Sequence, residues 1–204
     1  MNMKKILFLL FIGLFFQQVK AQYVGIKGGY NYASLSGDVN PGVELSRYHG
    51  FYGGVTMDFP LSNLFFVQTE GLYTRIGGTV NVTGSGVKVA LDYISVPVLL
   101  GMKVYERLSA QVGPQFNFLA KKSKFSYKKN EEEVIVEKAF DNFDLLLGIG
   151  LKYTTSSGYF VEARFNQGLT NIADSSNESL KKMNISSTNN FKNSYISIGM
   201  GYRF

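Results

Sequence analysis

The feature that most constrains the fold of this chain is a strict alternation of apolar and polar residues. In Asn193–Phe204, "NSYISIGMGYRF", every second residue is apolar: Ile196, Ile198, Met200, Tyr202 and Phe204. The residues between them are mostly small or polar. Because successive side chains of a β-strand point to opposite faces, this pattern predicts a strand whose two faces lie in different environments.

The same alternation recurs along the chain and predicts eight strands. They are expected at Tyr23–Tyr32, Gly50–Phe59, Leu64–Arg75, Val89–Val104, Leu108–Leu119, Phe143–Tyr153, Tyr159–Leu169 and Asn193–Phe204. Each is close to the length of about 9–11 residues that a tilted strand needs to cross a bilayer. By contrast, no segment after the first 21 residues resembles a membrane-spanning helix.

The connections between these strands alternate between short and long. The short ones are "PLSN", "YER" and "TTSSG", and the long polar ones are Ala33–His49, Ile76–Lys88, Ala120–Asn142 and Thr170–Lys192. Short turns at one end and long loops at the other are typical of outer-membrane barrels. We therefore expect an all-β fold, an eight-stranded antiparallel up-and-down transmembrane β-barrel. Its even strand number would place both termini in the periplasm.

Parity alone does not say which face of the strands points inward, and a soluble lipocalin-type barrel would bury the apolar face. The polar face here is rich in Gly, Ser, Asn and Gln, which suit the crowded interior of an eight-stranded barrel. Aromatic residues make up 15% of the chain and gather near the strand ends, as the two girdles of a membrane barrel do. We therefore expect the apolar face to point outward, into lipid.

The first residues resemble a secretory signal peptide. Lys4 and Lys5 precede the apolar run "ILFLLFIGLFF", which is too short for a membrane-spanning helix of about 20 residues. We expect cleavage after Ala21, so that 1–21 is the signal peptide and 22–204 the barrel domain. A retained N-terminal anchor is the alternative. Without Lys4, Lys5 and Lys20 the net charge falls from +6 to +3, and we expect no nucleic-acid partner.

Four segments of the sequence resemble the PorT-like outer-membrane β-barrel family of Bacteroidetes. They are "VGIKGGYNYA", "DYISVPVLLG", "EARFNQGLTNI" and the terminal "IGMGYRF". The resemblance implies a barrel in the outer membrane, inserted by the barrel-insertion machinery and surrounded by outer-membrane lipids. It also implies that Tyr202 and Phe204, in the terminal aromatic strand, are the insertion signal. PorT itself is associated with protein export through the type IX secretion system, so secretion-system proteins are possible partners.

Nine charged residues fall on the face expected to point inward. They are Lys27, Asp58, Glu70, Lys103, Asp144, Lys152, Glu162, Arg164 and Arg203. They could line a gated pore, or they could form a network of ion pairs in a filled interior. We favour the filled interior, because open aqueous channels need about twice as many strands.

His49, the only histidine, is the one residue that could act as a catalytic base, with Ser36, Asp38 or Ser46 in the neighbouring loop. Their spacing has no mechanistic signature, so we expect no enzyme activity. The chain has no Cys, and this single His does not make a metal-ligand cluster. We accordingly expect neither a cofactor nor a metal site, and no catalytic residues.

The loop Ala120–Asn142 contains "KKSKFSYKKNEEEVIVEK", in which lysines precede glutamates. It could be a basic patch for phosphate groups or an acidic partner. It could also be a hairpin that extends the fifth and sixth strands above the membrane, with Lys facing Glu across its strands, which the alternation in both halves favours.

Taken together, these features predict a non-enzymatic integral outer-membrane protein. It would be a component of protein export or a structural envelope protein. A narrow porin-like channel for small solutes is the alternative, and a barrel enzyme at His49 is a second one.

Overall fold

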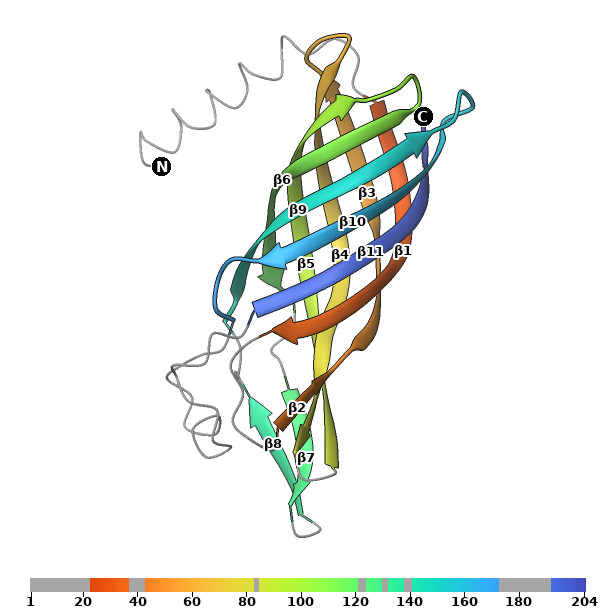
Figure 1. Cartoon of the computed structure of the whole chain (residues 1–204). Helices are drawn as coiled ribbons and strands as arrows, with labels where there is room; N and C mark the ends of the chain where they lie inside the picture. The colour runs from red at the N-terminus through yellow and green to blue at the C-terminus, as the bar shows by residue number, and fades with distance from the viewer. Residues whose placement is uncertain are drawn as a thin grey trace, which may run out of the picture.

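The computed structural model describes residues 23–36, 43–82, 85–120, 124–129, 132–137, 141–172 and 192–204. Eight long strands close into one tilted barrel (Figure 1). They are β1 (Tyr23–Ser36), β3 (Tyr48–Pro60), β4 (Phe65–Val82), β5 (Ser85–Lys103), β6 (Leu108–Leu119), β9 (Phe143–Thr154), β10 (Tyr159–Gly168) and β11 (Lys192–Arg203). The described ranges hold no helix long and apolar enough to cross a membrane. The signal-peptide expectation, 1–21, lies outside the described residues.

Every barrel strand pairs antiparallel with its neighbour along the chain, and β11 returns to β1. The closing seam runs from Gly25 opposite Arg203 to Ser36 opposite Lys192. Such closure leaves no open edge in the barrel wall, so backbone groups are bonded within the sheet. The expected eight-stranded antiparallel barrel is therefore confirmed, and each predicted strand corresponds to one barrel strand.

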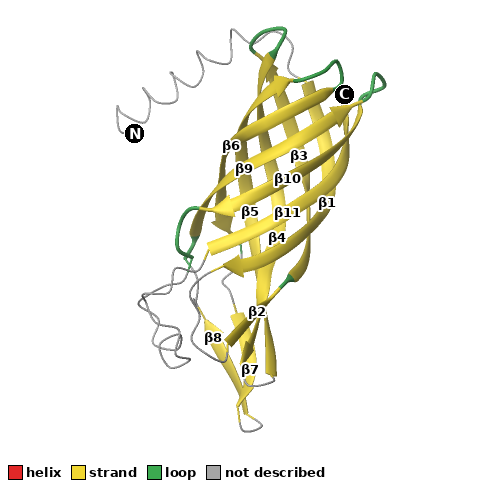
Figure 2. Cartoon of the chain, viewed as in Figure 1, coloured by secondary structure: helices red, strands yellow, loops and turns green. Residues whose placement is uncertain are grey.

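The two ends of the barrel differ, as the connection lengths predict. At the turn end, short connections follow β3, β5 and β9 (Figure 2). The turn before β10 needs Gly158, whose φ of +90° is unfavourable for other residues. Phe204 donates its backbone N–H to the carbonyl oxygen of Val24 over 2.8 Å, so the first and last described residues also lie at this end.

The opposite end, the loop end, is more ordered into strands than predicted. The expectation of a loop at Ile76–Lys88 is wrong, because β4 and β5 continue as a paired hairpin until Val82 lies opposite Ser85. Val and Thr still alternate there, so the strand pattern persists past the glycines at 77 and 78. Within the expected loop Ala33–His49, a short strand β2 (Val43–Ser46) pairs with β4.

The Lys- and Glu-rich segment forms the expected hairpin, of β7 (Lys124–Lys129) and β8 (Glu132–Glu137). Its register sets lysine opposite glutamate at three positions: Lys124 and Glu137, Lys128 and Glu133, and Lys129 and Glu132. It is a separate two-stranded sheet, however, and not a continuation of the barrel strands. Most of the expected loop Thr170–Lys192 lies outside the described residues.

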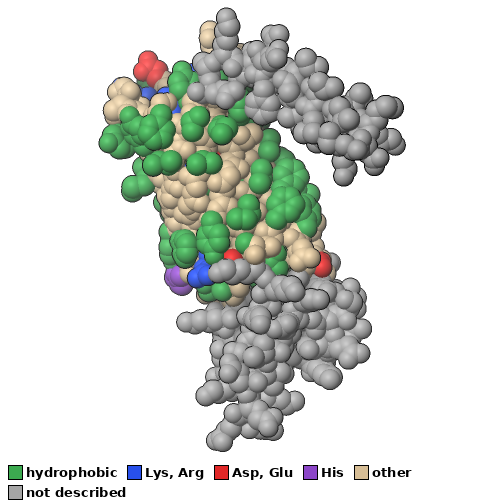
Figure 3. All heavy atoms as spheres, turned by 180° about the vertical axis from the view of Figure 1, so that it is seen from behind, with side chains coloured by type: hydrophobic (Ala, Val, Ile, Leu, Met, Phe, Trp, Pro, Cys, Tyr) green, Lys and Arg blue, Asp and Glu red, His purple; other side chains and the backbone are tan. Residues whose placement is uncertain are grey.

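The outer wall of the barrel carries the apolar side chains, as the alternation predicts (Figure 3). In β11, Ile198 and Met200 are 61% and 69% exposed, whereas Ser197 is buried. Exposed aromatic residues mark both ends. Phe65, Tyr153, Tyr159 and Phe204 lie toward the turn end, and Tyr30, Phe51, Phe118 and Phe143 toward the loop end. The apolar face therefore points outward, and the soluble-barrel alternative is excluded by this arrangement.

The interior is filled by large side chains that pack over glycines. Tyr52 from β3 reaches across to the seam between β1 and β11. There a Cβ on Gly29 would lie 2.6 Å from Cε1 of Tyr52 and 2.7 Å from Cα of Gly199. Such distances are too short for any real Cβ, and the carbonyl oxygen of Ile198 would lie closer still, so Gly29 is required by the ring of Tyr52 and by the adjoining backbone of β11.

The neighbouring Gly28 provides a test of this packing, because it points to the other face and a Cβ there would meet its nearest atom at 3.5 Å. We expect Gly29→Ala to lower the free energy of unfolding by about 1–3 kcal/mol through overpacking. Gly28→Ala should leave it unchanged or raise it slightly. Urea unfolding of both variants in the same detergent measures this, and equal midpoints would contradict the packing argument.

Candidate functional site

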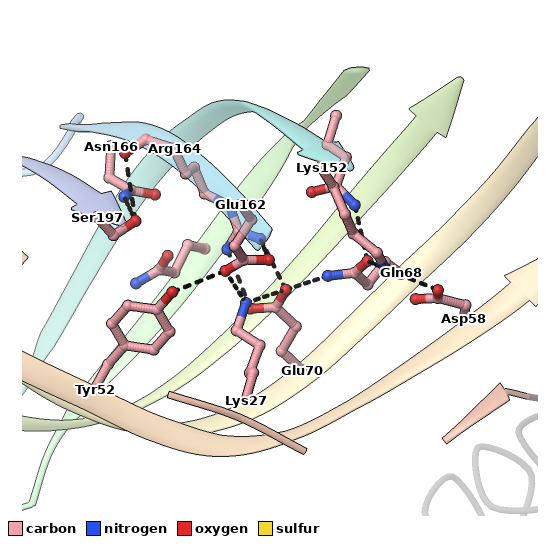
Figure 4. Close-up of polar contacts among 12 residues, drawn as sticks. Lys27, Tyr52, Asp58, Gln68, Glu70, Lys152, Glu162, Arg164, Asn166 and Ser197 are labelled. Atoms are coloured by element: carbon pink, nitrogen blue, oxygen red, sulfur yellow. Dashed lines mark hydrogen bonds and ion pairs between the residues drawn. The ribbon is translucent and has the colours of Figure 1, made fainter. Parts of the chain in front are cut away.

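Seven of the nine charged residues expected inside the barrel are buried in it. They are Lys27, Asp58, Glu70, Asp144, Lys152, Glu162 and Arg164. Strands β1, β3, β4, β9 and β10 contribute them, and strand alternation directs each side chain inward. Six of the seven converge in one polar cluster, the buried charge network (Figure 4). This network is the candidate functional site.

Glu70 is the centre of the buried charge network. Its Oε1 accepts from Nζ of Lys27 and from Nη2 of Arg164, each at 2.8 Å, and Oε2 accepts from Nη1 of Arg164 at 3.1 Å. Lys27 also donates to Glu162 at 2.5 Å. Glu162 in addition accepts a 3.0 Å hydrogen bond from the hydroxyl of Tyr52. Two carboxylates and two cations thus bridge the full width of the barrel.

A second branch extends the network toward the turn end. Nζ of Lys152 donates to Oδ2 of Asp58 at 2.8 Å and to Oε1 of Gln68 at 2.6 Å. Gln68 donates to Glu70 and accepts from Gln111 at 2.8 Å, so its amide connects the two branches. The side chains of the whole cluster come from six of the eight barrel strands.

The charges of this network balance. Lys27, Lys152 and Arg164 face Asp58, Glu70 and Glu162, so three cations meet three carboxylates. Removing each ion from water costs several kcal/mol, and only close opposite charges and hydrogen bonds offset that cost. The arrangement is therefore stable as a set, and the loss of one member leaves its partners buried without compensation.

The loop half of the interior is closed by uncharged polar groups and one carboxylate. Asp144 accepts from Nδ2 of Asn193 at 2.7 Å and from the hydroxyl of Thr170 at 2.9 Å. Gln115 donates to the hydroxyl of Tyr195 at 2.6 Å. Between these groups and the charge network lies a cavity of about 10 Å³. That volume holds about one water molecule.

The other two expected interior charges lie at the turn end. Lys103 is exposed and Arg203 is half-buried, and both line a wider opening there. Each is the last residue of its strand, so its side chain extends past the packed interior. The guanidinium of Arg203 stacks on the ring of Tyr23, 4.5 Å from its centre. Tyr202, an expected insertion-signal residue, packs edge-on against Phe204 with ring centres 5.2 Å apart.

His49 lies on the outer wall near the loop end, among aromatic residues. Its Nδ1 is hydrogen-bonded to the hydroxyl of Tyr30, and its ring centre is 5.5 Å from that of Tyr32. Ser36, a possible nucleophile, instead donates to the backbone oxygen of Lys192 at 3.3 Å. Asp38 is outside the described residues. No group of three or more His, Cys, Asp or Glu suited to a metal ion occurs in the described part of the chain.

The uncharged members of the network were not predicted from the sequence. Tyr52, Gln68 and Gln111 are buried: Tyr52 donates to Glu162, Gln68 bonds to Glu70 and Lys152, and Gln111 donates to Gln68. The sequence did place each of them on the inward face, because each shares that face with a charged or small residue of its strand. Their partners come from strands far apart in sequence, so only the closed barrel shows which groups meet.

Among the members of the buried charge network, Glu70 is the one whose loss should lower the free energy of unfolding most. Glu70→Gln keeps the size of the side chain but leaves Lys27 and Arg164 with one carboxylate between them. We expect the free energy of unfolding to fall by about 3–5 kcal/mol. Glu106→Gln removes an exposed carboxylate and should change it by less than about 0.5 kcal/mol. Urea unfolding in detergent compares the two, and similar midpoints would show that the network contributes little.

Solved outer-membrane barrels share this fold. The attachment invasion locus protein Ail of Yersinia pestis is 17% identical, with a TM-score of 0.52 over 91% of this chain and 100% of Ail. Neisserial surface protein A is 12% identical, with a TM-score of 0.53 over 91% of this chain and 100% of that protein. At these identities the likeness shows the fold alone. No curated protein sequence is similar enough to this chain to count as a match.

The family comparison agrees with the architecture. The model of the outer membrane protein beta-barrel domain family matches residues 16–174, which is most of the chain. The match includes the strands that supply Lys27, Glu70 and Arg164. With a closed eight-stranded wall, an apolar exterior and a polar interior, the chain belongs to the outer membrane protein beta-barrel domain family and is an integral outer-membrane protein.

Proposed function

We propose that this protein is a non-enzymatic and non-conducting outer-membrane barrel that acts by binding other molecules at its two ends. The observation that carries this proposal is the charge-balanced network that fills the barrel. A channel needs a continuous water-filled path, whereas here the charged groups of the network bind one another and their polar neighbours across the interior. Eight-stranded barrels generally have interiors just wide enough for side chains.

The proposal includes an orientation. The turn end lies in the periplasm together with both termini of the processed chain, and the loop end lies outside the cell. Short periplasmic turns and longer extracellular connections are the usual arrangement. In this orientation the signal peptide 1–21 directs export, and the barrel-insertion machinery recognises Tyr202 and Phe204.

The specific role that we propose is PorT-like, as a component of a protein-export system. The support is the resemblance of four strand segments to that family, together with a filled barrel that leaves the two ends as the working surfaces. A structural envelope protein is the second candidate. It is favoured by the ordered strands at the loop end, where β2, β4 and β5 form a sheet beyond the barrel rim.

The two other functions considered from the sequence are less well supported. A narrow solute channel would require the buried charge network to open. A barrel enzyme would require a nucleophile beside His49, whose side chain contacts the tyrosines at 30 and 32 within the described part of the chain.

Conductance tests the filled interior directly. We expect the purified protein in a planar bilayer to show no steady single-channel current. The double variant Glu70→Ala/Arg164→Ala removes one charge of each sign and the centre of the network, so its net charge is unchanged. It should admit water and show measurable current if it still folds. A steady current from the wild-type protein would overturn the proposal.

A deletion strain tests the role in export. We expect loss of the gene to reduce the amount of secreted protein, and crosslinking in native membranes to capture other envelope proteins at the turn end. The wild-type gene restored on a plasmid is the control. Normal secretion with a weakened envelope would favour the structural role, and normal secretion with altered solute uptake would favour the channel.

A further inference from the structure

The turn end of the barrel contains an open pocket that the interior network does not use. It has a volume of about 370 Å³, which is within the range of about 300–1,000 Å³ typical of ligand sites. Three turns and the ends of β1 and β11 surround it. Its lining includes the side chains of Lys103, Arg107, Arg203 and Glu106.

The rim of this turn-end pocket is positively charged. Lys103 and Arg107 are exposed, Arg203 is half-buried, and none of the three has an ion-pair partner among the described residues. Glu106 is the one carboxylate on the rim, so the rim carries a net charge of +2. At the floor, Lys152 and Asp58 neutralise each other at 2.8 Å. The unpaired charge is therefore at the surface, where a ligand can reach it.

The shape and lining of the pocket distinguish among anionic ligands. The cations stand on different elements: the end of β5, the turn after it, and the end of β11. The lining also includes Phe65, Tyr23 and the hydroxyl-bearing residues Ser109, Thr154 and Ser156. A single phosphate would meet only part of this surface. A peptide supplies several carboxylates, a backbone for the hydroxyls and methylene groups for the rings.

We propose that the turn-end pocket binds an acidic peptide segment, rich in Asp and Glu, of a periplasmic partner protein. This inference rests on the proposed function, since it names the chemistry and the place of a partner at one end of the barrel. Arg203 is held in position by its stacking on Tyr23, and Lys103 and Arg107 extend from the rim to the carboxylates. The ligand binds outside the filled interior, so the barrel stays closed.

The test uses the processed, full-length protein in lipid nanodiscs, where both ends are accessible. The probe is a short fluorescein-labelled peptide rich in glutamate, and its matched control has glutamine at every glutamate position. Fluorescence anisotropy should show binding of the acidic peptide alone. Binding should weaken as salt rises from about 0.05 to 0.5 M, because exposed charges are screened.

The variant that locates the site is Lys103→Gln/Arg107→Gln, which changes two exposed side chains and leaves the charge network intact. We expect it to weaken binding about tenfold. The control is Arg47→Gln, an exposed guanidinium 4.7 Å from the ring centre of Tyr32 on the wall toward the loop end. It should bind the peptide as the wild-type protein does. Heat-modifiable gel migration confirms that each variant is folded.

Three outcomes would overturn the inference: no binding of the acidic peptide, equal binding of the glutamine peptide, or equal weakening by the Arg47 substitution. Complete displacement of the acidic peptide by millimolar inorganic phosphate would show that the pocket binds a simple anion and not a peptide. In each case a closed wild-type barrel in the bilayer measurement would leave the proposed function standing. A conducting barrel that still bound the peptide would refute the proposed function alone.

Discussion

The structure depends on the sharing of Glu70 between Lys27 and Arg164. A barrel whose outer face is apolar must place its polar residues inside, where water cannot solvate them. Carboxylates and cations are stable there only when an opposite charge or a neutral hydrogen-bonding group lies at hydrogen-bond distance. Glu70 provides this contact for two cations at 2.8 Å each, and Glu162 and Gln68 connect it to the rest of the network. Ion pairs between side chains in the interior thus hold the strands together.

This constraint supports the proposed function. Because the charged groups of the network are bonded to one another across the interior, we propose a barrel that binds at its ends rather than one that conducts solutes. The two ends differ in chemistry. The loop end extends into a sheet of β2, β4 and β5, whereas the turn end opens into a basic pocket. A protein that links the outer membrane to a periplasmic partner would use the second of these.

Much of the fold could be predicted because strand alternation is a local property. The segment Leu108–Leu119 was predicted with the bounds that the structure has, and every other barrel strand was predicted within a few residues except at the loop end. There, Ile76–Lys88 was predicted as a long polar loop, but pairing between β4 and β5 continues through most of it. Strand length at this end depends on the partner strand, which local sequence does not report.

The sequence by itself determined the alternation, and with it the number of strands, the two faces and the set of charges that point inward. It also indicated the outer membrane, because the two faces suit lipid and a packed polar interior. Only the tertiary structure decided which charges meet, since Lys27 and Glu162 are 135 residues apart and become neighbours through barrel closure. It likewise showed that Lys103 and Arg203, which were expected in the interior, line the turn-end pocket. Whether a side chain faces inward or outward follows from its position along one strand. How deep it lies in the barrel and which side chains it contacts follow from the register of all eight strands.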